Sequence, residues 1–267
     1  MTFKDKYGPV ALIAGGSEGI GAAFAHALAE RGLDLVLVAR RKEQLEATAA
    51  EIRRKFDVHV SVISCDLAAS DALKQLKTAT EGQQINFLVY NAALSYIGHY
   101  LDHDVAEHER IADVNMVTPV KLLHYFGGKM VAQGRGGVVM MSSLAGMQGS
   151  GYLASYAATK AFSNVLAESL WYEWKHKGVD VISCIAGATS TPNYINTQPG
   201  KTSALAPKPQ RPERVVAECL RQIGKRPSFI SGRANRLACF FMQRILPKKM
   251  AVTIMGDNMR AMYRIKY

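Results

Sequence analysis

Short apolar segments alternate with longer amphipathic segments along the chain, and this alternation restricts the possible folds more than any other feature. The apolar, strand-length segments lie at 9–14, 34–39, 58–64, 86–90, 137–142, 179–185 and, more weakly, 227–231. Helical patterns lie near 20–31, 42–55, 70–80, 103–132, 154–177 and 212–223. Uniformly apolar strands are covered on both faces, and strand–helix–strand order is typical of right-handed crossovers. We therefore expect an α/β fold, a doubly wound and mainly parallel seven-stranded sheet with helices on both faces.

The domain organisation predicted from the sequence is simple. The chain has 267 residues, 48% of them hydrophobic, which allows one large domain with a substantial core and excludes a disordered chain. We expect a single domain over 1–267, with a substrate loop at about 188–211 and a basic helical extension at about 234–267. The loop contains four prolines and follows the sixth predicted strand, at the sheet edge where such folds bind ligands.

The sequence predicts a cytoplasmic protein. The first ten residues lack an apolar signal core, and no apolar run approaches the roughly 18 residues of a membrane helix. The four cysteines are scattered without a C-x-x-C pair, which argues against a disulfide framework. Histidines occur at 99, 103 and 108 without a nearby cysteine, so we expect no metal site.

Positive charge is concentrated at the C-terminal end. Residues 225–267 contain ten Lys or Arg and one acidic residue, a net +9, which leaves +2 of the total +11 for residues 1–224. The sequence leaves open whether this segment is the solvated face of packed helices or a weak contact surface for a partner or an anionic membrane. The apolar residues mixed with these charges include Leu237, Phe240, Phe241, Met242, Ile245 and Leu246.

A glycine-rich turn, AGGSEGIG, connects the first predicted strand to the first long predicted helix. Its glycines, Gly15, Gly19 and Gly21, have the spacing G-x-x-x-G-x-G. Glycine lets a phosphate approach the backbone, and the following helix directs its positive end toward that phosphate. The turn therefore predicts a dinucleotide-binding site, and a tight turn without a ligand is the alternative.

Two arginines indicate which dinucleotide is bound. Arg40 and Arg41 directly follow the second predicted strand, where an acidic residue would bind the ribose 2′-hydroxyl of NAD. A guanidinium instead pairs well with a 2′-phosphate. The sequence predicts NADP(H), and the alternative is that these arginines only begin a surface helix.

Tyr156 and Lys160 are four residues apart in a helical pattern, so they share one helix face. A neighbouring ammonium favours the phenolate, so we expect it to lower the pKa of Tyr156. Tyr156 could then donate a proton to a carbonyl in reduction, or accept one in oxidation. Ser143 lies 13 residues before Tyr156, at the end of the fifth predicted strand, where its hydroxyl could hold a substrate oxygen. Ser142 is the alternative for that role.

Together these motifs resemble the short-chain dehydrogenase/reductase family, in its compact, Rossmann-like and NADP(H)-preferring form. The resemblance covers 9–192 strongly and 211–235 loosely. It implies that Ser143, Tyr156 and Lys160 are catalytic, with Asn115 as a fourth member at a helix kink that holds a water beside the lysine. A second Tyr-x-x-x-Lys pair, at 125 and 129, has no serine 13 residues earlier and is interpreted as incidental.

The resemblance also implies a set of cofactor-binding positions. Asp66 would bind the adenine ring, Asn91 would also brace the sheet, and the threonines would contact the nicotinamide end. The sequence departs from the family pattern where Ala14 replaces Thr and Ala186 replaces Pro. The implied residues are Gly15, Ser17, Glu18, Gly19, Ile20, Arg40, Arg41, Asp66, Leu67, Asn91, Ala92, Tyr156, Lys160, Gly187, Thr189 and Thr191.

The predicted reaction is the NADPH-dependent reduction of bulky hydrophobic ketones to secondary alcohols, reversible as an alcohol dehydrogenase. The hydride comes from the nicotinamide and the proton from Tyr156. The alternatives are a 3-ketoacyl thioester or steroid reductase, or a non-catalytic NADP(H)-sensing protein. We expect a small hydrophobic carbonyl or alcohol substrate, no nucleic-acid partner, and, from the resemblance, a homodimer or homotetramer.

Overall fold

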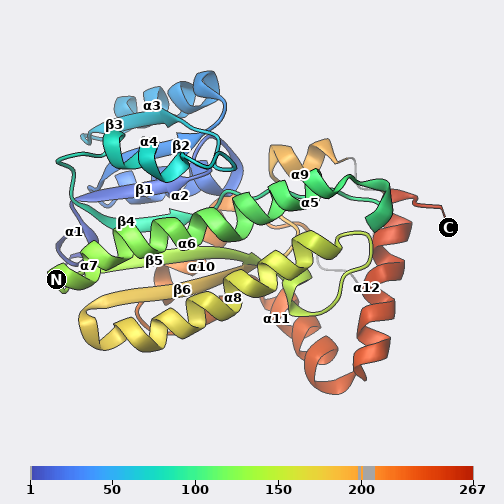
Figure 1. Ribbon diagram of the computed structural model, residues 1–267. Helices are drawn as coiled ribbons and strands as arrows, with labels where there is room; N and C mark the ends of the chain where they lie inside the picture. Colours follow the sequence, from blue (N-terminus) through green and yellow to red (C-terminus); the bar gives the residue numbers. More distant parts are fainter. Residues whose placement is uncertain (1, 198–199, 201–207, 267) are drawn as a thin grey trace.

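A seven-stranded parallel sheet forms the centre of the computed structural model, which describes residues 2–197, 200 and 208–266 (Figure 1). The strand order is β3-β2-β1-β4-β5-β6-β7, so the chain reverses its direction of winding between β1 and β4. This confirms the predicted doubly wound α/β sheet. The strands are β1 (Val10–Ala14), β2 (Asp34–Ala39), β3 (Val60–Ser64), β4 (Ile85–Tyr90), β5 (Gly136–Ser143), β6 (Val179–Ala186) and β7 (Ser228–Ile230).

The helices cover both faces of the sheet. The longer ones agree with the predicted helical patterns to within a few residues, whereas α1, α9 and those after β7 were not predicted as separate elements. In chain order the α-helices are α1 (Phe3–Tyr7), α2 (Gly19–Ala29), α3 (Lys42–Lys55), α4 (Ala72–Ala79), α5 (Val105–Ala112), α6 (Thr118–Leu122), α7 (Gly128–Gln133), α8 (Ala154–Trp174), α9 (Pro192–Asn196), α10 (Pro212–Gln222), α11 (Arg233–Phe240) and α12 (Lys248–Tyr263). The 3₁₀ and π turns are η1 (Tyr100–Asp102), η2 (Asp113–Val117), η3 (Leu123–Gly127), η4 (Leu144–Met147), η5 (Lys175–Lys177) and η6 (Phe241–Ile245).

Two hydrophobic cores, one on each face, explain why the strands are apolar throughout. Ala11 and Ile13 of β1 point into the core formed with α2, α3 and α10. Leu12 and Ala14 point into the opposite core, formed with α4, α7 and α8. Because successive side chains of a strand alternate between faces, a strand covered on both sides needs apolar residues at every position.

The predicted loop at 188–211 contains a short helix, which corrects the expectation of an irregular segment. The Thr191 hydroxyl accepts a hydrogen bond from the N–H of Tyr194 at 3.2 Å, and Pro192 occupies the first turn of α9, so the sequence provides a cap and a favourable helix start. Thr189 and Gln210 form a β-bridge that joins the two ends of the segment. Residues 198–199 and 201–207 lie outside the described residues.

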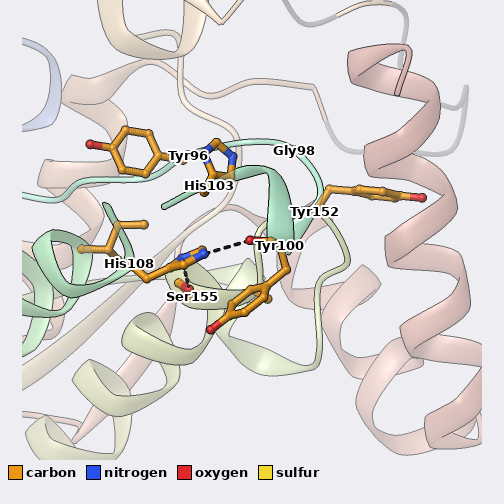
Figure 2. Close-up of a pocket in the computed structure, with 9 residues that line it drawn as sticks. Tyr96, Gly98, Tyr100, His103, His108, Tyr152 and Ser155 are labelled. Carbon is orange, nitrogen blue, oxygen red and sulfur yellow. Dashed lines mark hydrogen bonds between the residues drawn. The ribbon is translucent and has the colours of Figure 1, made fainter. Parts of the chain in front are cut away.

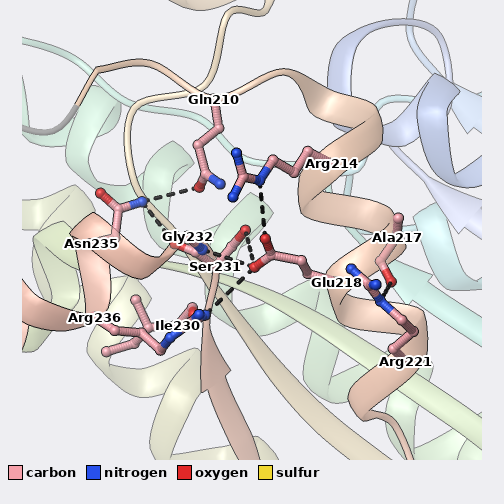
Figure 3. Close-up of polar contacts among 10 residues, drawn as sticks. All are labelled: Gln210, Arg214, Ala217, Glu218, Arg221, Ile230, Ser231, Gly232, Asn235 and Arg236. Carbon is pink, nitrogen blue, oxygen red and sulfur yellow. Dashed lines mark hydrogen bonds and ion pairs between the residues drawn. The ribbon is translucent and has the colours of Figure 1, made fainter.

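After β7, the elements α11, η6 and α12 form a hairpin that extends from the carboxyl edge of the sheet (Figure 1). We call residues 233–263 the C-terminal hairpin. Its base is held by Glu218 of α10, whose carboxylate accepts hydrogen bonds from the Gly232 N–H at 2.9 Å and from Arg214 at 3.1 Å (Figure 3). Burial alone would raise the pKa of Glu218, but these hydrogen bonds and the nearby Arg236 hold it below its usual value.

Over the described part of the chain, no helix combines the length and the apolar character needed to cross a membrane.

Candidate active site

A cavity of about 1150 Å³ lies at the carboxyl edge of the sheet. The glycine turn, the ends of β2 to β6 and the C-terminal hairpin all contribute to its wall. Every residue predicted to bind the cofactor, from Gly15 to Thr191, lines this cavity, as do Ser143, Tyr156 and Lys160. Residues that are far apart in the sequence therefore meet at the sheet edge where this architecture binds ligands.

The glycine turn has no room for side chains. Gly15 has a φ of +82° and Gly19 a φ of +57°, a region that favours glycine. A Cβ placed on Gly21 would lie 1.8 Å from the carbonyl oxygen of Gly15. The turn is braced by Asn91, whose side-chain N–H donates to that same oxygen at 2.9 Å. This tight backbone before the N-terminus of α2 fits a bound diphosphate.

The missing family threonine at position 14 leaves the brace intact. The carbonyl oxygen of Ala14 accepts hydrogen bonds from the N–H groups of Asn91 and Ala92, at 3.0 and 2.8 Å. The N–H of Gly15 donates to the Val38 carbonyl oxygen at 2.7 Å. Backbone hydrogen bonds to both neighbouring strands therefore hold the turn.

The two predicted 2′-phosphate ligands lie beside the glycine turn. Arg40 and Arg41 are both exposed and line the cavity. The Arg41 guanidinium forms an ion pair with Glu18 at 2.7 Å, and Glu18 is part of the glycine turn. A pair of exposed guanidinium groups at this position fits a phosphate better than a ribose hydroxyl.

Asp66 follows β3 and lines the adjoining part of the cavity. Its carboxylate accepts hydrogen bonds from the Ala68 N–H at 3.0 Å and from Arg110 at 2.6 Å. Partial burial raises its pKa, but these two hydrogen bonds and the positive charges of Arg110 and Arg40 outweigh that effect and lower it overall. Asp66 is therefore ionised at neutral pH and oriented by neighbouring groups.

Helix α8 presents Tyr156 and Lys160 to the cavity from one face. The Lys160 ammonium lies 5.6 Å from the centre of the Tyr156 ring and donates to the carbonyl oxygen of Met141 at 2.9 Å. The Ser142 hydroxyl donates to the carbonyl oxygen of Lys160 at 2.8 Å, so it braces α8 against β5. Ser143, in contrast, forms a side-chain hydrogen bond with Tyr156. This geometry favours Ser143 over Ser142 for the role next to the tyrosine.

Burial sets the protonation of this pair. It raises the pKa of Tyr156, and the hydrogen bond with Ser143 only partly offsets this. The expected lowering by Lys160 is therefore not seen, because the ammonium is directed at the Met141 carbonyl rather than at the phenol oxygen. Burial also lowers the pKa of Lys160 to about 8. The site thus holds a neutral phenol, able to donate a proton, beside an amine that titrates near neutral pH.

Asn115 does not line the cavity wall among the described residues; it is buried behind the wall, in the π turn η2. Its amide donates to the Leu94 carbonyl oxygen and to the Thr159 hydroxyl, each at 2.9 Å, and its side-chain oxygen accepts from the Leu94 N–H at 2.8 Å. The predicted helix kink is thus present as a π turn. The structure shows Asn115 as a brace between that turn, the segment after β4 and α8.

The threonines after β6 close the wall near the glycine turn. A Cβ on Gly19 would lie 2.9 Å from the Thr191 methyl group, so these two segments touch. The Thr189 hydroxyl donates to the carbonyl oxygen of Gly187 at 3.0 Å. The segment keeps a defined turn although Ala186 replaces the family proline.

The C-terminal hairpin supplies much of the remaining wall, and its methionines are the cavity-lining residues that the sequence indicates least clearly. Methionine spacing alone does not separate a cavity wall from a packed core. Its cavity-lining residues include Phe241, Met242, Ile254, Met255, Met259, Met262 and Tyr263.

The histidine-containing segment lies around a separate, small cavity of about 30 Å³ (Figure 2). The His108 ring bonds to the Ser155 hydroxyl and to the Tyr100 carbonyl oxygen, each at 2.9 Å, and His103 contacts Glu107 at 3.2 Å. Tyr96 also lines this small cavity. The described residues contain no group of three or more side chains arranged to hold a metal.

Comparisons with known proteins agree with this geometry. The family model for short chain dehydrogenase matches residues 9–202. A 7beta-hydroxysteroid dehydrogenase of Clostridium sardiniense is 36% identical over 236 residues, which is 88% of this chain and 90% of the relative. A solved structure from work on 7beta-hydroxysteroid dehydrogenase stereoselectivity has a TM-score of 0.90 at 33% identity, covering 96% of this chain and 99% of that one.

A short-chain dehydrogenase from Sphingobium yanoikuyae, solved in complex with NADPH, has a TM-score of 0.74 at 29% identity and covers 84% of this chain and 87% of that one. The match of the family model to most of the chain agrees with the glycine turn and with the Ser143–Tyr156–Lys160 arrangement. This protein belongs to the short-chain dehydrogenase family of oxidoreductases.

Proposed function

We propose that this protein is an NADP(H)-dependent carbonyl reductase for bulky, mainly apolar ketones, and that ketosteroids are its substrate class. The observation that carries the proposal is the placement of Ser143, Tyr156 and Lys160 in one cavity with the glycine turn and an apolar wall. The steroid assignment is supported by the similarity to a hydroxysteroid dehydrogenase over most of both chains.

The chain's own residues account for the proton in the proposed reaction. NADPH, when bound, supplies the hydride. The Ser143 hydroxyl, which bonds to Tyr156, holds the carbonyl oxygen of the substrate beside the phenol. Tyr156 then donates its proton to that oxygen, and in the reverse direction its phenolate accepts the proton of the alcohol. Lys160, whose pKa burial lowers to about 8, bonds to the Met141 carbonyl oxygen in this structure, and its ammonium would stabilise the phenolate once it turns toward the phenol oxygen.

The residues present fit NADPH. The glycine turn lines the cavity directly before the N-terminus of α2, which suits a diphosphate, and Arg40 and Arg41 provide two cations for a 2′-phosphate. The sensing alternative has less support, because a protein that only binds the dinucleotide has no need of a serine, tyrosine and lysine aligned in the cavity.

The size and chemistry of the wall support a bulky substrate. Ligand pockets usually measure about 300–1000 Å³, and the cavity of about 1150 Å³ exceeds this range, as expected of a site for both a dinucleotide and a large second ligand. Methionine side chains adapt their shape to apolar ligands. Three of them, Met255, Met259 and Met262, line the cavity from α12.

We also propose one functional domain, a homodimer or homotetramer, and a cytoplasmic location. Pairing through the helices of 103–132 and 154–177 is supported by exposed apolar side chains there, notably Val120 at 44%, Val165 at 61% and Tyr172 at 67% exposure. A reducing compartment agrees with four cysteines that are all free and buried.

The test is NADPH oxidation measured with a simple ketone, a diaryl ketone, a 7-ketosteroid and a 3-ketoacyl thioester. We expect the highest kcat/KM with the ketosteroid. Tyr156→Phe should lower kcat by about 10²- to 10⁴-fold, the usual contribution of a general acid, while NADPH binding is kept. Tyr125→Phe, in the second Tyr-x-x-x-Lys pair, is the matched control and should leave kcat unchanged.

Two results would contradict the proposal. If Tyr156→Phe retains turnover, another group supplies the proton. If the wild-type protein binds NADPH but reduces none of the ketones, the protein is a dinucleotide sensor and not a reductase. A preference for the acyl thioester would leave the reductase function in place and change only the substrate class.

A further inference from the structure

The C-terminal hairpin exposes a cluster of large apolar side chains. Leu237, Phe240, Phe241 and Ile245, which we call the hairpin patch, have exposures of 60%, 53%, 50% and 58%. The sequence left open whether this segment is the solvated face of packed helices or a contact surface, and all four apolar side chains are at least half exposed. An apolar cluster of this kind on a surface marks an interaction site.

Exposed basic residues lie within and on both sides of the hairpin patch along the chain. Arg233, Arg244, Lys248 and Lys249 are all exposed. No aspartate or glutamate occurs in the sequence from 233 to 256. Short helices that combine exposed aromatic and aliphatic residues with lysine and arginine are typical of segments that lie in the interface of anionic membranes.

The hairpin patch and the wall of the large cavity share a residue. Phe241 belongs to the patch and also lines the cavity, and Ile254 of α12 is 38% exposed and lines the cavity as well. Phe241 therefore belongs both to the patch and to the cavity wall, and we take the cavity to open beside the patch. An apolar ligand that leaves a bilayer at the patch would therefore meet the methionine-lined wall directly.

The patch is also held in place relative to the proposed active site. The Gln243 amide of η6 donates to the Met147 carbonyl oxygen at 3.0 Å and to the Gln148 side chain at 2.7 Å. Met147 ends the turn that starts next to Ser143. Together with the Glu218 contacts at the base of the hairpin (Figure 3), these hydrogen bonds hold the patch at one end of the site.

We propose that α11 and η6 dock on the surface of membranes that contain anionic phospholipids. The hairpin patch enters the interface, and Lys248 and Lys249 lie among the headgroups. A second copy of this chain is a poorer occupant, because a symmetric contact would bring the same basic side chains against each other. Delivery of an apolar substrate through this surface rests on the proposed reductase function, whereas the docking itself does not.

The experiment is flotation of the full chain with vesicles of phosphatidylcholine alone or of equal parts phosphatidylcholine and phosphatidylglycerol. We expect binding to the mixed vesicles at low salt, and weaker binding at high salt because salt screens exposed charges. Lys248→Glu with Lys249→Glu should reduce the partition coefficient by about thirtyfold or more, since each basic residue near an anionic surface contributes about 1 kcal/mol. Phe240→Ser with Ile245→Ser should reduce it by at least about tenfold.

A matched control separates docking from general charge attraction. Lys74→Glu with Lys225→Glu changes the net charge by the same amount on other exposed surfaces and should leave binding nearly unchanged. Thermal unfolding of each variant checks that the fold is kept. The proposal is wrong if the wild-type chain does not float with the mixed vesicles, or if the control pair weakens binding as much as the Lys248 and Lys249 pair. It is also wrong if the patch variants reduce the oligomer size in sedimentation velocity, because a second copy then covers the patch.

Discussion

Replacing Asn115 tests whether the position of α8, which carries Tyr156 and Lys160, depends on a buried brace. Asn115 is 2% exposed and makes three side-chain hydrogen bonds, two to the backbone of Leu94 and one to Thr159. Each buried hydrogen bond contributes about 0.5–1.5 kcal/mol. Asn115→Ala should therefore lower the free energy of unfolding by about 2–4 kcal/mol, which for a domain of this size is a fall in Tm of about 5–15 °C.

Asn115→Ala should also affect the geometry of the candidate active site. Thr159 bonds to Asn115 and also donates to the carbonyl oxygen of Tyr156 at 2.8 Å, so the loss of one contact loosens the turn of α8 that carries Tyr156, the proposed proton donor. We expect kcat to fall at least about tenfold while NADPH binding changes little, because small misplacements of a reacting group are costly. The assays are thermal unfolding, NADPH titration and steady-state kinetics.

Asn86→Ala is the matched control. Asn86 is completely buried, but its side chain makes one hydrogen bond, at 3.3 Å to the Arg135 carbonyl oxygen, on β4. It should show a smaller fall in Tm and an unchanged kcat. Equal effects of the two substitutions, or a Tm for Asn115→Ala within about 3 °C of the wild type, would refute the reasoning that assigns Asn115 a bracing role.

Two further predictions concern the cofactor and the base of the hairpin. Arg40→Ala with Arg41→Ala should raise the Kd of NADPH by about 10- to 100-fold, as expected for lost charge-assisted bonds to an exposed phosphate, and change that of NADH by less than about threefold. If a fluorescence titration shows equal increases in the Kd of NADPH and of NADH, these arginines do not recognise the 2′-phosphate. Glu218→Gln should lower Tm at neutral pH. The folded-state pKa of Glu218 lies below its ordinary 4.5, so the ionised carboxylate stabilises the fold fully above pH 4.5 and loses this effect as the pH falls through the folded-state pKa. The difference in Tm between the wild type and Glu218→Gln should therefore narrow below pH 4.5. A Tm difference that does not change with pH would contradict this role of Glu218.

Local pattern was sufficient for the sheet, the glycine turn and the tyrosine–lysine pair. The seven strands appear as apolar runs because a strand that is buried on two faces has apolar residues at successive positions, and such a run is visible in the sequence. Tyr156 and Lys160 were predictable because a helix places residues four apart on one face. The glycines were predictable because close backbone approach, as between Gly21 and the Gly15 carbonyl, excludes every side chain.

The pKa of Tyr156, the bracing partners of Asn115 and the place of the C-terminal hairpin depended on the tertiary structure. Spacing predicts that a lysine lies near a tyrosine, but only the fold determines that the ammonium turns to Met141 and that burial raises the pKa of the phenol. Asn115 bonds to Leu94 and Thr159, contacts that no local pattern records.

The sequence by itself therefore determined the fold class, the glycine turn and the tyrosine–lysine pair, since each depends on residues close together in the chain. Only the tertiary structure decided which residues of 233–263 line the cavity and which are exposed. The segment is mixed in character throughout, and burial there depends on how the hairpin meets residues about a hundred positions away, such as Met147.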